Sequence, residues 1–160
     1  MDNIRELSIG SIIMVRHENN LFSIAQIEEL LQTKATVTIL ENNFDGFVTN
    51  FKPGTVHRVE YDNICGLAIR NMTLRDVGFV EADKNGWQLM FYYGDMKLLY
   101  QHDKRRGCAS FRFMSDFQKT FVRISCHTLH QLQNIMRFLT DGLEFKYNPI
   151  TADNGTKKYV

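Results

Sequence analysis

The chain has 160 residues and a formal net charge of +1, with 44% hydrophobic and 23% charged residues. That length and composition are ordinary for a globular protein that buries its own core without a metal or a disulfide. The near-neutral charge argues against a strongly basic nucleic-acid binder. No apolar run approaches the roughly 20 residues that a membrane-spanning helix needs.

The cysteines and the first residues point to a compartment. Cys65, Cys108 and Cys126 are an odd number, which leaves at least one free thiol. The polar opening Met1–Glu6 lacks the basic and apolar regions of a signal peptide. We therefore expect a reduced protein in the cytoplasm, without a membrane partner.

The first 70 residues read as short strands rich in alternating or β-branched residues. The predicted strands cover residues 11–16, 21–27, 35–40, 47–49 and 55–59. Residues 28–34 are either a long polar loop or one helical turn. Short strands that recur about every ten residues are typical of a small antiparallel barrel.

A short helix is predicted over residues 71–79, with Thr73 as its cap and Gly78 as its left-handed stop. Four strands follow, over residues 87–93, 97–101, 108–114 and 119–125. The dipeptide Asn85–Gly86 favours a tight hairpin before the first of them. Tight polar turns join the four strands, so the pattern predicts an antiparallel meander.

The stretch "HTLHQLQNIMRFLTDGLEF", residues 127–145, predicts a helix over residues 128–140. Thr128 is a good N-cap, and Gly142 is suited to the position after the helix. One face is apolar and is expected to pack on the meander; it holds Leu129, Leu132, Met136 and Leu139. The other faces are polar and hold Gln131, Gln133, Asn134 and Arg137. Residues 148–160 are expected to form a flexible tail.

A zinc site is one interpretation of the sulfur and nitrogen ligands near this helix, which are Cys108, Cys126, His127 and His130. Their spacing matches no common structural zinc pattern, and no C-x-x-C pair supports it. No local pattern marks a nucleophile beside a base either. We therefore predict no metal, no cofactor and no catalytic residue, and a protein that is not an enzyme.

A basic turn is the best candidate for nucleic-acid binding, because aromatic residues interleave with it on the neighbouring strands. The candidate contacts are Lys104, Arg105, Arg106 and Arg112. The competing interpretation is a solvated hairpin turn, and nearby acidic residues that dilute the charge favour it. We expect a macromolecular partner that is a protein in preference to a nucleic acid.

Three stretches resemble a family of small uncharacterised phage and mobile-element proteins of gut anaerobic bacteria. Leu7–Ser11 resembles the family's opening "LRIGN", and Leu67–Phe79 resembles its "I-P-L-T … L … G-F" element. His130–Asn134 and the residues after it resemble its ending "HQLQNLYFALTGEEL". Asn71–Met72 departs from the pattern, because proline usually stands there. The resemblance implies an accessory protein in the cytoplasm of a bacterial host and brings no established activity or cofactor.

The predicted fold is therefore α+β and mostly β. An SH3-like barrel module over residues 7–70 precedes a second module over residues 71–147, in which the meander packs against the C-terminal helix. His130, Gln131 and Asn134 are expected to form a structural polar cluster that ties the helix start to the sheet or to the 71–79 element. The expected function is a non-enzymatic binding module for a host or phage protein. Nucleic-acid binding and the capture of a small nucleotide signal are the alternatives.

Overall fold

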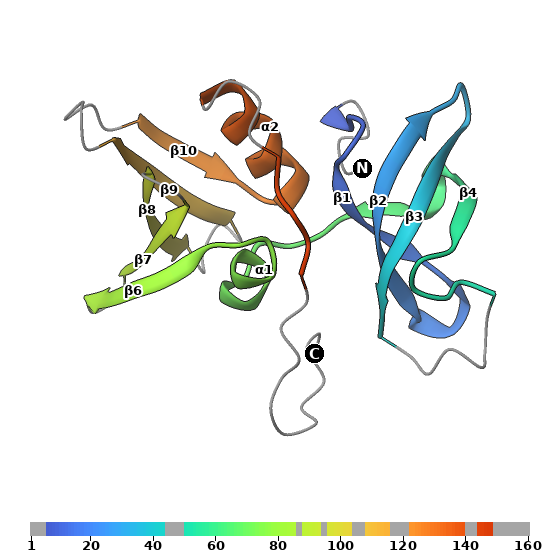
Figure 1. Cartoon of the computed structure of the whole chain (residues 1–160), viewed down its shortest axis with the longest axis horizontal. Coiled ribbons are helices and arrows are strands. Elements are labelled where there is room, and N and C mark those ends of the chain that lie inside the picture. The colour runs from blue at the N-terminus through green and yellow to red at the C-terminus, as the bar shows by residue number, and fades with distance from the viewer. Residues whose placement is uncertain are drawn as a thin grey trace.

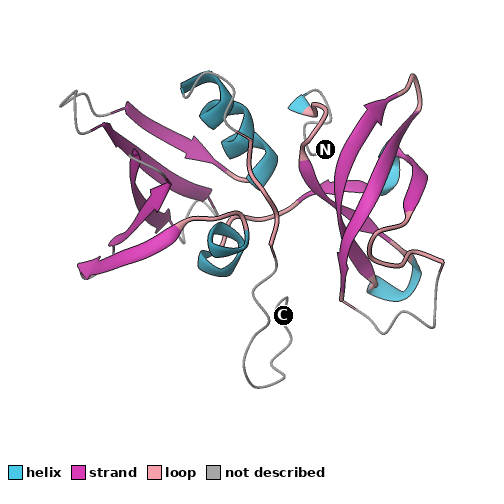
Figure 2. Ribbon diagram, in the orientation of Figure 1, coloured by secondary structure: helices cyan, strands magenta, loops and turns pink. Residues whose placement is uncertain are grey.

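The computed structural model describes residues 6–43, 50–85, 88–93, 96–103, 108–115, 122–139 and 144–148. The protein is α+β and mostly β (Figure 1, Figure 2). Two five-stranded antiparallel sheets carry most of the described residues, and helix α2 lies between them. No helix among these residues is both long enough and apolar enough to cross a membrane.

The first sheet has the strand order β4-β3-β2-β1-β5. Its strands are β1 (Ile12–Arg16), β2 (Phe22–Leu30), β3 (Lys34–Asn42), β4 (Val56–Glu60) and β5 (Ile64–Gly66). On β3, Ala35, Val37 and Ile39 are buried and alternate with half-buried residues, as a strand with one face on a core requires. The sheet is open, because among the described residues no strand pairing joins β4 to β5.

One prediction in this region is wrong, and one strand was not predicted. Residues 28–34 are neither a long loop nor a helical turn, because β2 continues to Leu30 and β3 begins at Lys34. The exposed strand ends look polar in sequence, yet they pair across the hairpin. The fifth strand is β5, which was not predicted because three residues are too few to show alternation; its pairing with β1 holds it. The predicted strand 47–49 lies outside the described residues.

The second sheet has five strands in simple meander order, and not the four that were predicted. They are β6 (Val80–Asn85), β7 (Gln88–Tyr93), β8 (Met96–Asp103), β9 (Cys108–Ser115) and β10 (Val122–Cys126). The missed strand β6 reads as a polar turn in sequence. It forms because its backbone pairs with β7 up to Asn85 opposite Gln88.

Helix α1 (Asn71–Asp76) confirms the predicted short helix but corrects its start. Arg70 holds the cap position without a side-chain capping bond, and Thr73 lies inside the helix, where its hydroxyl donates to the Ala68 carbonyl at 3.3 Å. Gly78 follows with a φ of 99°, the left-handed conformation that ends the helix.

Helix α2 (Leu129–Leu139) contacts β1 of the first sheet and β10 of the second. Its predicted apolar residues Leu129, Leu132 and Met136 are fully buried. They belong to one core cluster that also holds Ile12 and Ile24 of the first sheet. The two sheets therefore share a core through this helix, although a second cluster lies within the first sheet alone.

Candidate functional site

The predicted polar cluster sits at the start of α2, where its residues do different things. His130 is only 3% exposed, and its Nε2 lies 3.3 Å from the Thr128 hydroxyl. Gln131 turns back on its own helix, where its Oε1 accepts hydrogen bonds from the backbone N–H groups of His127 (2.9 Å) and Thr128 (3.2 Å). The Thr-x-x-Gln spacing is a capping-box pattern that could have predicted this role.

Gln133 is the residue that sequence reasoning missed. It was placed on a polar face, but it is only 1% exposed. Its Oε1 accepts a hydrogen bond from the Ile12 N–H at 2.7 Å, and its Nε2 donates to the Gly10 carbonyl at 3.1 Å. A helix period alone cannot distinguish a polar residue that faces water from one that satisfies the backbone of a neighbouring strand.

Asn134 and Arg137 extend this contact along the N-terminal segment. Asn134 donates to the Glu6 carbonyl at 2.6 Å and accepts from the Ser8 hydroxyl at 3.0 Å. Arg137 donates to the Ile9 carbonyl at 2.9 Å. Residues 6–12 and 133–137 thus form a polar clamp that joins the first sheet to the helix. An architectural role explains these contacts without a ligand.

The structure describes only some of the residues of the other predicted sites. Cys126 is buried, and no group of three metal-ligating side chains occurs in the described part of the chain. Lys104, Arg105 and Arg106 lie outside the described residues. Arg112 lies on β9, opposite Leu99 of β8, and the structure describes its backbone but not its side chain. Nucleic-acid contact by these residues stays a prediction.

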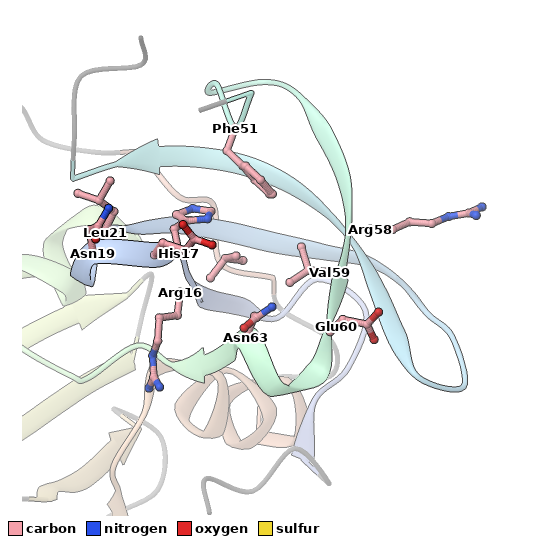
Figure 3. A pocket seen from close by; sticks show the side chains of 11 residues that line it. Arg16, His17, Asn19, Leu21, Phe51, Arg58, Val59, Glu60 and Asn63 are labelled. Atoms are coloured by element: carbon pink, nitrogen blue, oxygen red, sulfur yellow. The ribbon is translucent and has the colours of Figure 1, made fainter. Parts of the chain in front are cut away.

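A groove of about 580 Å³ opens on the first sheet and was not predicted (Figure 3). This groove is lined by Val15, Arg16, His17, Glu18, Asn19, Leu21, Phe51, Arg58, Val59, Glu60 and Asn63. Val15 and Val59 are buried at its base, while Glu18, Asn19 and Asn63 are exposed at its rim. Figure 3 shows the Arg58 side chain pointing away from the rings of Phe51 and His17. The groove therefore combines an apolar base with a polar rim.

Three rings in mutual contact support one wall of the groove, with His57 stacked on Phe51 and His17 tilted against it. The ring centroids of His17 and Phe51 are 4.5 Å apart, and those of Phe51 and His57 are 4.1 Å apart. The Ser23 hydroxyl donates to Asn42 Oδ1 at 2.7 Å and so has no second proton to give. It must accept from His17 Nε2, which lies 2.7 Å away. The neutral His17 ring therefore carries its proton on Nε2.

His57 is held in the same way. The Thr55 hydroxyl donates to the Lys52 carbonyl at 2.6 Å, so it accepts from His57 Nε2 at 2.7 Å. Because hydroxyls orient both imidazoles around one phenyl ring, the wall is preorganised before any ligand arrives.

Asn19 at the rim of the groove and the adjacent Asn20 have backbone in a sparsely populated conformation. Asn19 and Asn20 have φ values of 58° and 60° in the turn between β1 and β2. Asparagine tolerates the left-handed region better than other non-glycine residues, yet such residues still carry some strain. Strain of this kind is concentrated at binding sites, which makes the turn a candidate contact region.

Acid is expected to destabilise this wall. Burial, and to a lesser extent the neighbouring His57 imidazole, lower the pKa of His17 below its usual 6.5. The unfolded chain then binds more protons than the folded chain at acid pH. The stabilisation is complete above about pH 6.5 and is lost as the pH falls through the lower folded pKa.

His17→Gln keeps a donor for Ser23 but cannot be protonated. Urea unfolding at pH 5 and at pH 7.5 should show a smaller loss of stability for this variant than for the wild-type chain. His127→Gln at an exposed position is the control and should lose as much as wild type. An equal acid loss in His17→Gln and wild type would remove His17 as the cause.

Comparisons of the chain with protein-family models, curated proteins and solved structures find no match. The geometry of the groove and of the polar clamp is therefore the basis for a functional conclusion.

Proposed function

We propose that the chain is a non-catalytic binding module whose groove holds an extended segment of a partner protein. The observation that carries this proposal is the groove's apolar base inside a polar rim, which is the plan of a protein–protein contact. The preorganised ring wall supports it, since a rigid site loses less entropy on binding. The resemblance to phage and mobile-element proteins favours an accessory role in a bacterial host.

The first module is best accounted for as an SH3-like small barrel. β4 and β5 lie at opposite edges of the sheet, yet only the turn Tyr61–Asn63 joins them. Across a flat five-stranded sheet the edges would be roughly 19 Å apart, at about 4.8 Å per strand. A turn of that length in a 3₁₀ conformation spans only about 8 Å. Such a short connection supports a sheet that curls toward closure and leaves the groove beside the gap.

Selection of short linear peptides from a random display library on the purified full chain tests the function. We expect peptides that bind the wild-type chain and lose at least about tenfold in affinity for Asn63→Arg, because an added arginine at the rim occludes the groove. Fluorescence anisotropy with a labelled selected peptide measures the loss. Asn63 is exposed, so the folded state should tolerate the change.

Asp62→Arg is the control, because it places an arginine on an exposed neighbour that does not line the groove and changes the net charge by more than Asn63→Arg does. It should bind within about twofold of wild type if charge alone is not the cause. Peptides that bind Asn63→Arg as well as wild type would contradict the proposal. A volume of about 580 Å³ also suits a small molecule. If native mass spectrometry shows a co-purified mass that disappears on denaturation, the ligand of the groove is a small signal molecule and not a peptide.

A further inference from the structure

The open edge of β4 borders the groove. The hydrogen bonds between β3 and β4 show which backbone groups of β4 a ligand at this edge would contact. Ile39 N donates to the Thr55 carbonyl at 2.9 Å, and Tyr61 N donates to the Thr33 carbonyl at 3.4 Å. These two bonds lie at opposite ends of the β3–β4 ladder and follow one register. In an antiparallel pair, every second pair of opposed residues exchanges hydrogen bonds.

This alternation shows which residues of β4 bond to β3 and which face away from it. His57 and Val59 lie in the hydrogen-bonded pairs, opposite Val37 and Ala35. Val56, Arg58 and Glu60 lie between them, so their N–H and C=O groups point away from β3 toward the open edge. Within the part of the chain that the structure describes, no strand pairs with β4 on that side.

The groove lies at this edge. Arg58, Val59 and Glu60 contribute to its lining, and Val59 lies across it from the ring of Phe51 (Figure 3). A row of unpaired backbone groups beside an apolar space is a template for an added strand.

From this we infer that the partner segment binds as an additional strand on β4, with its backbone bonded to Arg58 and Glu60. The inference rests on the proposed function and deepens it by defining the mode of recognition. The peptide residue opposite Arg58 would exchange both hydrogen bonds with it, as in an antiparallel ladder.

Strand alternation also specifies the chemistry of the partner. A residue opposite Arg58 has its side chain on the solvent face, beside a guanidinium that makes no ion pair in the described part of the chain. Glu60 on the same face is already paired with Lys34 at 2.7 Å. The two neighbours of that peptide residue point the other way, toward Val59 and the rings. The occupant is therefore an extended segment in which an acidic residue lies between two apolar residues.

Arg58→Pro compared with Arg58→Ala tests the mode of binding. Both variants remove the guanidinium, but only proline removes the outward N–H. β4 should tolerate proline because this N–H makes no bond to β3. We expect Arg58→Ala to weaken binding of the selected peptide by up to about fivefold, as for a lost cross-strand ion pair. Arg58→Pro should weaken it by at least a further tenfold or so, because a peptide carbonyl loses its donor.

Methylating one peptide amide at a time provides a second readout that leaves the protein unchanged. Methylation of alternate amides should abolish binding, while methylation of the amides between them should have little effect. The thermal midpoint of Arg58→Pro serves as the folding check.

The outcomes separate the two proposals. If Asn63→Arg abolishes binding but Arg58→Pro binds like Arg58→Ala and no alternation follows methylation, the groove remains the site and strand addition is overturned. If the selection yields no peptide, or Asn63→Arg binds like wild type, the proposed function fails and strand addition fails with it.

Discussion

Gly66→Ala is expected to lower the free energy of unfolding by about 1–3 kcal/mol, the usual cost of overpacking a close contact. A Cβ at this position on β5 would lie 2.2 Å from Cγ2 of Thr128 and 3.1 Å from Cε1 of His130. Neither neighbour can withdraw easily, since Thr128 directly precedes α2 and His130 is buried in its first turn. Urea unfolding monitored by circular dichroism measures the change as a shift of the midpoint.

The double variant Gly66→Ala/Thr128→Ser shows whether the clash is the cause. Serine lacks the Cγ2 atom but keeps the hydroxyl, so the combined loss should be smaller than the sum of the two single losses. Strict additivity would mean that Gly66 does not lie against the helix start as the structure places it.

Gln133→Leu is expected to destabilise the chain by about 1–3 kcal/mol for each backbone group that it leaves unsatisfied in the interior. The Ile12 N–H loses its acceptor and the Gly10 carbonyl loses its donor, while leucine adds no polar atom to replace them. Hydrogen exchange of the Ile12 amide should accelerate at the same time, because the polar clamp opens locally. Chemical denaturation and exchange mass spectrometry measure the two effects.

Asn134→Ala is the matched comparison, one residue further along the helix. Its bond to the Glu6 carbonyl is exposed, so water replaces that partner, and the Ser8 hydroxyl that also bonds Asn134 keeps the Ser11 hydroxyl as a partner. The cost should therefore be about 1 kcal/mol or less. If Gln133→Leu costs no more than Asn134→Ala, the burial of Gln133 does not contribute to the coupling of the two sheets.

The sequence predicts well those elements whose side chains repeat with a clear period. Alternation marks β3, and the apolar residues Leu129, Leu132 and Met136 mark the buried face of α2. Elements that depend on a partner strand are missed. β5 is too short to show a pattern, and β6 is polar. Each is held by backbone pairing with a neighbouring strand, which its own residues do not indicate.

The candidate site also has one part that the sequence could predict and one part that it could not. The capping role of Gln131 follows from its distance to Thr128 along the chain and could have been predicted from local sequence. The groove could not, because Arg16–Leu21 and Phe51–Asn63 are brought together only when the sheet forms. No local pattern shows that these segments meet.

The sequence alone predicts the class of the protein, which is mostly β with one amphipathic helix near the end of the chain. These properties depend on neighbours in the chain and on their periodicity. Which polar residue is buried, which strand edge is open and where the groove lies can be seen only in the folded chain. Those properties depend on contacts between distant residues, such as Gln133 with Ile12, because a backbone donor must find its acceptor wherever the fold places one.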